Sequence, residues 1–329
     1  MAYVYSNGEG AWIGYINNTK PGGSSGDVLI EIDSIGNKRN LYEHNGVSWA
    51  LNRTADNEGP IVDDVSSVNS PLSVEFESYK ADNATQFRVP NVYKSVNFFA
   101  HRGARMIAPE NTIHAFEKAG MLKYWGIETD IQQTSDGVWV IYHDTTLDTM
   151  SDGTGAIKYK TLAEIKALNI TVGVNLAYYP NSKIPTLEEY LVICKKYGVT
   201  PVIEDKVYFT QAQADSVVAV LRKNNMLEKA IITSYNPTSL LYIRNASKVL
   251  QTALALDSWV DTNIQVMLDN GIDIAGISSG SCTQVAVELC HSNNISVATF
   301  TLNTMANIKT FIARGVDFIY SDSINGEVT

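Results

Sequence analysis

From about Asn97 onward, short apolar runs alternate with longer segments in which apolar residues recur every three or four positions. The short runs are typical of buried strands, and the longer pattern is typical of amphipathic helices. The pattern predicts eight strands, at residues 98–100, 127–130, 201–205, 230–234, 252–256, 274–278, 297–301 and 317–321. It predicts helices between most of them, including residues 112–122, 186–197, 213–224, 260–270 and 304–315. This alternation favours an α/β fold, a (β/α)8 TIM barrel, over an open parallel sheet.

A ninth apolar run, residues 138–144, follows the strand at 127–130 too closely for a helical crossover. Parallel strands need a long crossover, whereas antiparallel strands can be joined by a short turn. We therefore expect a hairpin with Asp136 and Gly137 at its turn. If these two residues form the turn, His143 lies opposite Asp130.

Residues 1–92 differ in composition from the rest. They are rich in Gly, Asn, Ser and Asp, and contain short runs of alternating apolar and polar residues such as VLIEIDSIG. Alternation of this kind predicts half-buried strands, and the segment PGGSSG at residues 21–26 is typical of a loop. We therefore expect two domains. A small all-β domain at residues 1–92, serving in attachment or oligomerisation, precedes the TIM barrel at residues 93–329.

Composition narrows the classes of partner. The net charge of −10 and the pI of about 5.0 argue against a nucleic-acid partner and against a basic face that docks on membranes. The three cysteines have no pairing pattern, so we expect buried thiols rather than disulfides. The start, MAYVYSNGEGAWIG, lacks the features of a signal peptide, and no run has the length of a membrane span. We therefore expect a soluble protein.

Charged and titratable residues gather at the predicted strand ends. In a TIM barrel, chemistry is located where the strands end at the carboxyl face. The residues at these ends are His101, Arg102, Glu128, Asp130, His143, Glu204 and Lys206. Glu128 and Asp130 are two apart and face the same side of a strand, so with Glu204 they repel one another unless a cation lies between them. Such an oxygen-only set suits Mg²⁺ or Ca²⁺, although a salt-bridge cluster with Arg102 and Lys206 explains it equally well.

The remaining groups suit work on a phosphodiester. His101 and His143 can act as general base and general acid. Arg102 can bind two phosphate oxygens at once, and Lys206 adds a second positive charge. Together with one metal ion, these groups describe phosphodiester cleavage.

Ordered motifs across the second half carry a resemblance to a known family. They are HRG at 101–103, APENT at 108–112, IETDIQQTSDGVWVIYHD at 127–144, IPTLEEYL at 184–191, VIEDK at 202–206, TFTLN at 299–303 and VDFIYSD at 316–322. In this order they resemble the glycerophosphodiester phosphodiesterase family, part of the phospholipase C-like phosphodiesterase barrels. The resemblance covers roughly residues 97–324.

The resemblance implies a role for each matching residue. His101 and His143 look like the family's catalytic pair, and Arg102 and Lys206 look like its phosphate contacts. The metal ligands implied are Glu128, Asp130 and Glu204, with Ca²⁺ favoured and Mg²⁺ as the alternative. Glu110 looks like a residue that supports the site, unless it only caps the helix that follows.

The chain also departs from the family pattern near the expected pocket rim. Phe300 stands where family members often have Trp, and Asp148 follows Leu147 where they often have Arg-Thr. Residues 169–182, with Tyr178 and Tyr179 as candidate substrate contacts, resemble the variable lid of the family.

Residues 26–49, GDVLIEIDSIGNKRNLYEHNGVSW, resemble a hairpin segment of bacteriophage tail-fibre and tail-spike proteins. This resemblance implies a phage tail-associated enzyme in the virion, able to form trimers and to contact other tail proteins, that degrades glycerol-phosphate teichoic acid. One alternative is a cytoplasmic enzyme acting on small glycerophosphodiesters. The other, from a different class, is a non-catalytic receptor module that binds teichoic acid.

Overall fold

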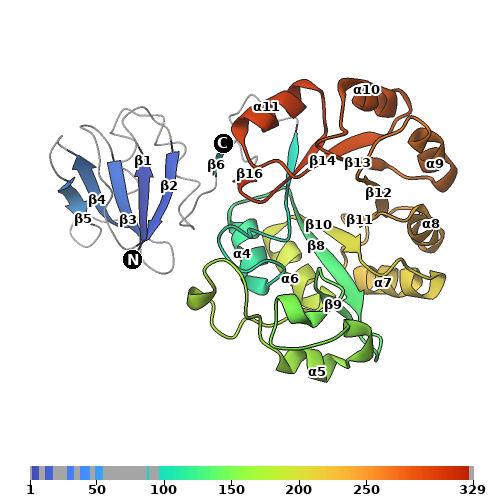
Figure 1. Cartoon of the computed structure of the whole chain (residues 1–329), viewed down its shortest axis with the longest axis horizontal. Coiled ribbons are helices and arrows are strands. Elements are labelled where there is room, and N and C mark those ends of the chain that lie inside the picture. The colour runs from blue at the N-terminus through green and yellow to red at the C-terminus, as the bar shows by residue number, and fades with distance from the viewer. Residues whose placement is uncertain are drawn as a thin grey trace. The chain divides into compact units, whose positions relative to one another are not determined.

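A computed structural model describes residues 96–325 and six short strands before them. These strands are β1 (Ala2–Ser6), β2 (Trp12–Asn17), β3 (Val28–Ile32), β4 (Lys38–His44), β5 (Trp49–Thr54) and β6 (Phe87–Arg88). The chain divides into two compact units, and the second begins at Val92. In the first unit, β1 to β5 form an antiparallel sheet in the order β2-β1-β3-β4-β5 (Figure 1, blue). An attachment role for residues 1–92 stays a prediction.

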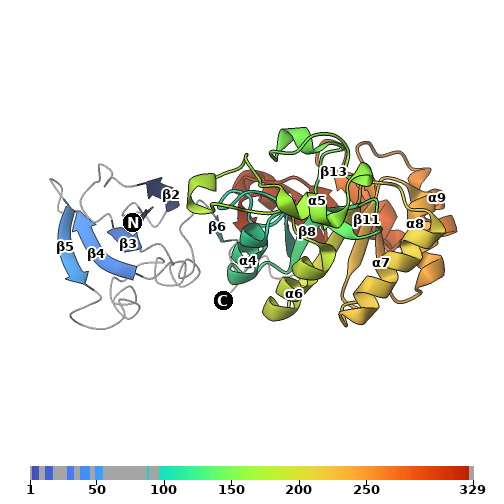
Figure 2. The same ribbon diagram turned by 90° about the horizontal axis from the view of Figure 1, so that it is seen from below.

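Eight parallel strands of the second unit form a closed barrel (Figures 1 and 2). They are β7 (Asn97–Ala100), β8 (Gly126–Gln133), β10 (Thr200–Asp205), β11 (Ile231–Ser234), β12 (Gln251–Leu256), β13 (Ile274–Ser278), β14 (Ser296–Phe300) and β15 (Phe318–Ser321). Their order is β10-β11-β12-β13-β14-β15-β7-β8, and β8 pairs with β10 to close the ring. The predicted TIM barrel is confirmed, and the open-sheet alternative is wrong.

Helices surround the barrel in Figure 1. They are α4 (Ile113–Met121), α5 (Leu162–Ala167), α6 (Leu187–Tyr197), α7 (Gln211–Lys223), α8 (Pro237–Ala246), α9 (Asn263–Asn270), α10 (Gln284–Ser292) and α11 (Met305–Ala313). Short 3₁₀ turns lie at Leu147–Thr149, Ile157–Tyr159 and Leu176–Tyr178, and a last strand, β16, spans Ile324–Asn325. Each of α4, α5, α6, α7, α10 and α11 begins after a threonine whose side-chain oxygen accepts a backbone hydrogen bond. Threonine satisfies a free amide there, so the sequence sets these helix starts locally.

The barrel interior is filled by one apolar layer. Its members are Phe99, Val202, Ile231, Ala253, Ile274, Ala298 and Tyr320. Because side chains on one face of a strand are two residues apart, the next inward positions lie nearer the carboxyl ends. For the first six members, those positions are His101, Glu204, Thr233, Ala255, Gly276 and Phe300, and all six line one pocket. The apolar layer therefore forms the floor on which the polar groups stand.

The predicted hairpin is confirmed, with a different register. β9 (Trp139–Ile141) pairs antiparallel with β8, and Ile131 lies opposite Ile141. Tyr142, rather than His143, therefore lies across from Asp130, and its amide donates to the Asp130 carbonyl oxygen at 3.0 Å. The predicted register is wrong by one residue because the loop holds three residues instead of two. Thr134 and Val138 flank this loop, and the Thr134 amide donates to the Val138 carbonyl oxygen at 2.9 Å.

Two expectations from composition bear on the described residues. Cys194, Cys282 and Cys290 are buried free thiols, as predicted. Among the helices that the structure describes, none combines the length and the apolar character needed to cross a bilayer.

Candidate active site

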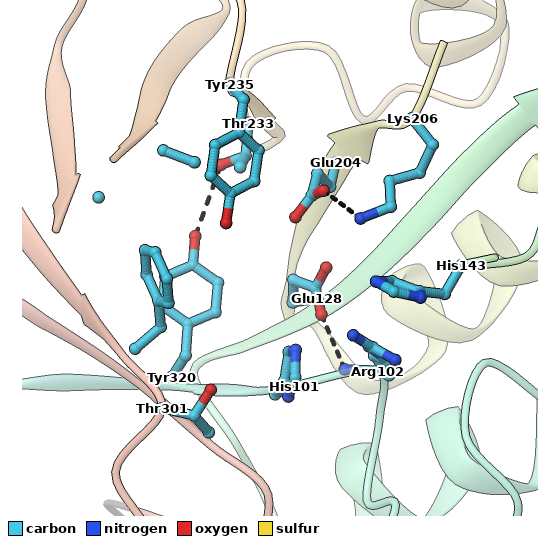
Figure 3. A pocket seen from close by; sticks show the side chains of 13 residues that line it. His101, Arg102, Glu128, His143, Glu204, Lys206, Thr233, Tyr235, Thr301 and Tyr320 are labelled. Atoms are coloured by element: carbon cyan, nitrogen blue, oxygen red, sulfur yellow. Dashed lines mark hydrogen bonds and ion pairs between the residues drawn. The ribbon is translucent and has the colours of Figure 1, made fainter. Parts of the chain in front are cut away.

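A pocket of about 220 Å³ opens at the carboxyl ends of the barrel strands (Figure 3). Its lining falls into two parts. The charged part comes from β7, β8, β10 and the loop after β9, and consists of His101, Arg102, Glu128, His143, Glu204 and Lys206. The other part comes from β11 to β15 and the residues beside them, and consists of Thr233, Tyr235, Ala255, Gly276, Phe300, Thr301 and Tyr320.

Three carboxylates converge on the charged side. Glu128, Asp130 and Glu204 each offer one oxygen, and these oxygens lie within 4.8 Å of one another. The register of β8 and β10 places Asp130 directly beside Glu204. Burial, together with the neighbouring Asp130 and Glu204 carboxylates, raises the pKa of Glu128 well above its ordinary value. Three hard oxygen donors on two rigid neighbouring strands, mutually repulsive without a cation, fit a divalent ion such as Ca²⁺ or Mg²⁺.

Two basic side chains adjoin the same carboxylates. The Lys206 ammonium lies 2.5 Å from Glu204 Oε1 and 3.3 Å from Asp130 Oδ1, and Arg102 Nε lies 3.6 Å from Asp130 Oδ2. Burial favours the neutral acid of Asp130, but Lys206 and Arg102 outweigh it and lower its pKa. The salt-bridge cluster weighed from the sequence therefore exists.

Arg102 is held in a demanding conformation. Its φ of 57° is left-handed, and its amide donates to Glu128 Oε2 at 2.8 Å. Its Nη1 donates to Glu110 Oε1 at 2.7 Å, whereas its buried Nε has no hydrogen-bond partner among the described residues. The following Gly103 has a φ of 77°, and a Cβ there would lie 2.8 Å from Ala115. The HRG motif therefore combines a strained backbone with a close approach to α4 that only glycine permits.

Glu110 lies beside the arginines instead of capping the helix. Its second oxygen pairs with Arg105 Nη2 at 2.5 Å. The N-cap of α4 is Thr112, whose Oγ1 accepts from the Ala115 amide at 3.2 Å. The capping alternative for Glu110 is wrong, and its carboxylate orients the guanidinium of Arg102.

Both histidines are held through the same ring nitrogen. His101 Nδ1 lies 2.7 Å from Asp322 Oδ1, and His143 Nδ1 lies 2.7 Å from Asp144 Oδ1. With Nδ1 occupied, Nε2 is the nitrogen left for proton transfer in the pocket. Figure 3 shows the two rings on the charged side of the pocket, near Glu128 and Arg102.

No role was predicted from the sequence for Asp322 or for Asn303, which holds it. Asn303 Nδ2 donates to Asp322 Oδ2 at 2.7 Å, and the Asp322 amide donates to Asn303 Oδ1 at 2.8 Å. Buried Asn111 was missed as well, and its Nδ2 donates to Asp130 Oδ2 at 2.7 Å. Asp322 directly follows β15, so the strand-end rule that found His101 applies to it equally.

The two candidate substrate tyrosines lie outside the pocket. Neither Tyr178 nor Tyr179 lines it, and the Tyr179 ring packs against His114 at a centroid distance of 4.8 Å. In the same loop, Asn175 Nδ2 donates to the Ile107 carbonyl oxygen at 3.0 Å. Asn175 and Tyr179 thus contact Ile107 and His114, and this arrangement does not support the expectation that the two tyrosines contact substrate.

A barrel whose carboxyl face holds a three-carboxylate set, two oriented histidines and two basic residues defines the class of barrel phosphodiesterases. A model of the "Glycerophosphoryl diester phosphodiesterase family" matches residues 101–325. The chain belongs to this family, as its motifs predicted, and is an enzyme of the phosphoric diester hydrolase type.

Curated relatives support this assignment. A "Glycerophosphodiester phosphodiesterase" of Bacillus subtilis is 30% identical over 242 residues, which cover 68% of this chain and 82% of the relative. "Glycerophosphodiester phosphodiesterase 1" of Bos taurus is 31% identical over 185 residues. That match spans only 55% of the bovine protein.

Solved structures share the fold. A phosphodiesterase of Oleispira antarctica, in complex with the product sn-glycerol-3-phosphate, has a TM-score of 0.65 at 23% identity. The match covers 71% of this chain and 96% of that one. A putative glycerophosphoryl diester phosphodiesterase of Silicibacter pomeroyi has a TM-score of 0.63 at 23% identity, covering 69% and 90% of the two chains.

Proposed function

We propose that the barrel hydrolyses glycerophosphodiesters with one divalent cation bound by Glu128, Asp130 and Glu204. The observation that carries this proposal is that both histidines line one pocket with Glu128 and Glu204, whose carboxylates form a cluster with that of buried Asp130. When bound, the cation supplies positive charge that attracts phosphate oxygens and lowers the pKa of a nearby hydroxyl. Ca²⁺ and Mg²⁺ both suit the oxygen donors.

The protein's own side chains bind the phosphate and move the protons. The guanidinium of Arg102, which lines the pocket, donates to a non-bridging phosphate oxygen, and Lys206 adds charge beside it. Nε2 of one histidine accepts the proton of the substrate hydroxyl that attacks phosphorus. Nε2 of the other donates a proton to the departing alkoxide as its bond to phosphorus breaks. Each proton transfer contributes about 10²- to 10⁴-fold in rate.

The attacking hydroxyl belongs to the glycerol unit, next to the phosphodiester. Its attack forms a cyclic phosphate and releases the leaving alcohol. Water then opens the ring, with the two histidines exchanging roles, and glycerol phosphate leaves.

Hydrolysis of a small glycerophosphodiester, followed with Ca²⁺, with Mg²⁺ and with chelator, tests this function. We expect metal-dependent release of the alcohol that is lost in His101→Ala. A matched control is His291→Ala. His291 lies on α10, pairs with Asp317 at 2.9 Å and does not line the pocket. Turnover that persists in His101→Ala, or a rate that the chelator does not change, contradicts the proposal.

We further propose that the natural substrate is glycerol-phosphate teichoic acid and that the protein acts at a phage tail. Teichoic acid of this type repeats the bond that the family name describes, and the segment at residues 26–49 resembles tail-fibre hairpins. Release of glycerol phosphate from the purified polymer by the full chain supports this substrate. If small diesters are cleaved and the polymer is not, the teichoic-acid proposal is wrong, and the alternative of a cytoplasmic metabolic enzyme takes its place.

The non-catalytic binding module is the least supported reading. A module that only holds polymer has no need for two histidines, each fixed by a carboxylate at 2.7 Å. Trimer formation and contacts with other tail proteins stay part of the proposal, and light scattering of the full chain tests the first of these.

A further inference from the structure

The side of the pocket opposite the three carboxylates is uncharged and carries four hydroxyl groups. They belong to Thr233, Tyr235, Thr301 and Tyr320, and those of the first, second and fourth residues concern the argument below. Between them, Ala255 and Gly276 have almost no side chain and leave the space open. Figure 3 shows the hydroxyls of Tyr235 and Tyr320 turned toward the same space, with a dashed line between the Tyr320 hydroxyl and Thr233.

The Tyr320 hydroxyl is buried without a good partner. The side chain is 6% exposed, and its one hydrogen-bond partner among the described residues is Thr233 Oγ1, at 3.5 Å. Hydroxyl hydrogen bonds are normally 2.5–3.0 Å long. Buried tyrosine hydroxyls usually find a partner, so one held at this distance and aimed into a pocket indicates a polar atom of the ligand.

The direction of this hydroxyl is fixed by packing. The Tyr320 ring meets Phe99 edge-on at a centroid distance of 4.8 Å and Phe300 edge-on at 6.2 Å. Tyr235 is less constrained: it is 39% exposed, and its hydroxyl lies 3.4 Å from Asp257 Oδ1. The first tyrosine is thus a rigid hydrogen-bonding group on the pocket floor, and the second is an adaptable one at the rim. Burial raises the pKa of both phenols, so both stay protonated at neutral pH.

We propose that Tyr320, assisted by Tyr235, determines specificity by hydrogen-bonding the terminal hydroxyl of the glycerol unit. This inference rests on the proposed function, in which the adjacent hydroxyl attacks phosphorus and the terminal one takes no part in bond making. In a glycerol-phosphate polymer only the end unit has a free terminal hydroxyl, so the inference there applies to cleavage at that end. The terminal hydroxyl needs a partner on the side away from the charged groups, and that side offers Tyr320. A site with a buried hydroxyl discriminates against a substrate that lacks the matching group, because the hydroxyl is then left unpaired.

Two phosphodiesters with the same leaving alcohol test the proposal. One carries glycerol, and the other carries propane-1,2-diol, which keeps the attacking hydroxyl and lacks the terminal one. The unchanged protein should prefer the glycerol diester. Tyr320→Phe should lower kcat/KM for the glycerol diester roughly 2- to 10-fold, the effect of one neutral hydrogen bond, and should leave the propane-1,2-diol diester unchanged. Phenylalanine keeps the ring packing, so the comparison isolates the hydroxyl.

Two further variants complete the experiment. Tyr235→Phe, at the half-exposed rim, should show the same loss of selectivity to a smaller degree. Tyr197→Phe is the control. Tyr197 lies on α6, donates its hydroxyl to Glu117 at 2.5 Å and does not line the pocket. Equal losses on both diesters, or no loss in either tyrosine variant, overturn this inference alone. If the unchanged protein cleaves neither diester, the proposed function fails and the inference fails with it.

Discussion

The structure assigns His101 a partner far away in the sequence, and the substitution Asp322→Asn tests that pairing. Asp322 follows β15, is 18% exposed, and approaches His101 Nδ1 to 2.7 Å. Asparagine has nearly the same shape as aspartate. The backbone amide of residue 322 donates to Asn303 Oδ1 at 2.8 Å, and this bond does not depend on the side chain at 322. The substitution therefore removes the charge and leaves the geometry in place.

The expected loss follows from the kind of hydrogen bond. A hydrogen bond to a charged group contributes about 1.5–3 kcal/mol. About 1.4 kcal/mol corresponds to a tenfold change in rate, so kcat should fall roughly 10- to 150-fold. An asparagine amide facing Nδ1 also favours the tautomer with its proton on Nε2, which impairs base function there. KM should change little, because Asp322 does not line the pocket.

Steady-state hydrolysis of a glycerophosphodiester gives kcat and KM separately. Asp317→Asn is the matched control, since Asp317 pairs with His291 at 2.9 Å outside the pocket, and it should leave kcat unchanged. Thermal unfolding of both variants reports any general damage to the fold. An Asp322→Asn enzyme with unchanged kcat, or one that loses activity only in proportion to its stability, would refute the positioning role.

Three further predictions concern the metal, the packing and pH. Glu204→Gln should raise the metal concentration for half-maximal activity at least about tenfold, measured by Ca²⁺ and Mg²⁺ titration; an unchanged titration contradicts its role as a ligand. Gly126→Ala should destabilise the barrel by about 1–3 kcal/mol in urea, because its Cβ would lie 2.8 Å from the Phe99 ring. Gly280→Ala, with no atom within 4 Å, is its control. Burial alone would raise the pKa of Asp322, but His101 and Asn303 outweigh it and lower that pKa. Its contribution to stability is therefore present above the ordinary carboxyl pKa and lost below it. The difference in Tm between wild type and Asp322→Asn should shrink from about pH 6 to about pH 3, and a constant difference contradicts this.

The sequence predicted the barrel and the strand ends because both depend on local patterns. Each strand is a short apolar run, and most helices start at a threonine cap that acts within three residues. Glu128 and Asp130 share a face because strand side chains alternate, whatever the strand pairs with. Apart from Glu110, the site residues named from the sequence therefore lie where the strand ends meet, and six of them line the pocket.

Tertiary structure alone decided the groups that orient these residues. His101 and Asp322 are 221 positions apart, and they meet only because β15 pairs with β7 as the barrel closes. The hairpin register depended on one additional loop residue, which shifted Tyr142 to the place expected for His143. Tyr320 has the pattern of an ordinary core residue, and only the packing of Phe99 and Phe300 aims its hydroxyl into the pocket. Local sequence determines which face a side chain takes, whereas its partners depend on long-range pairing that a single strand does not encode.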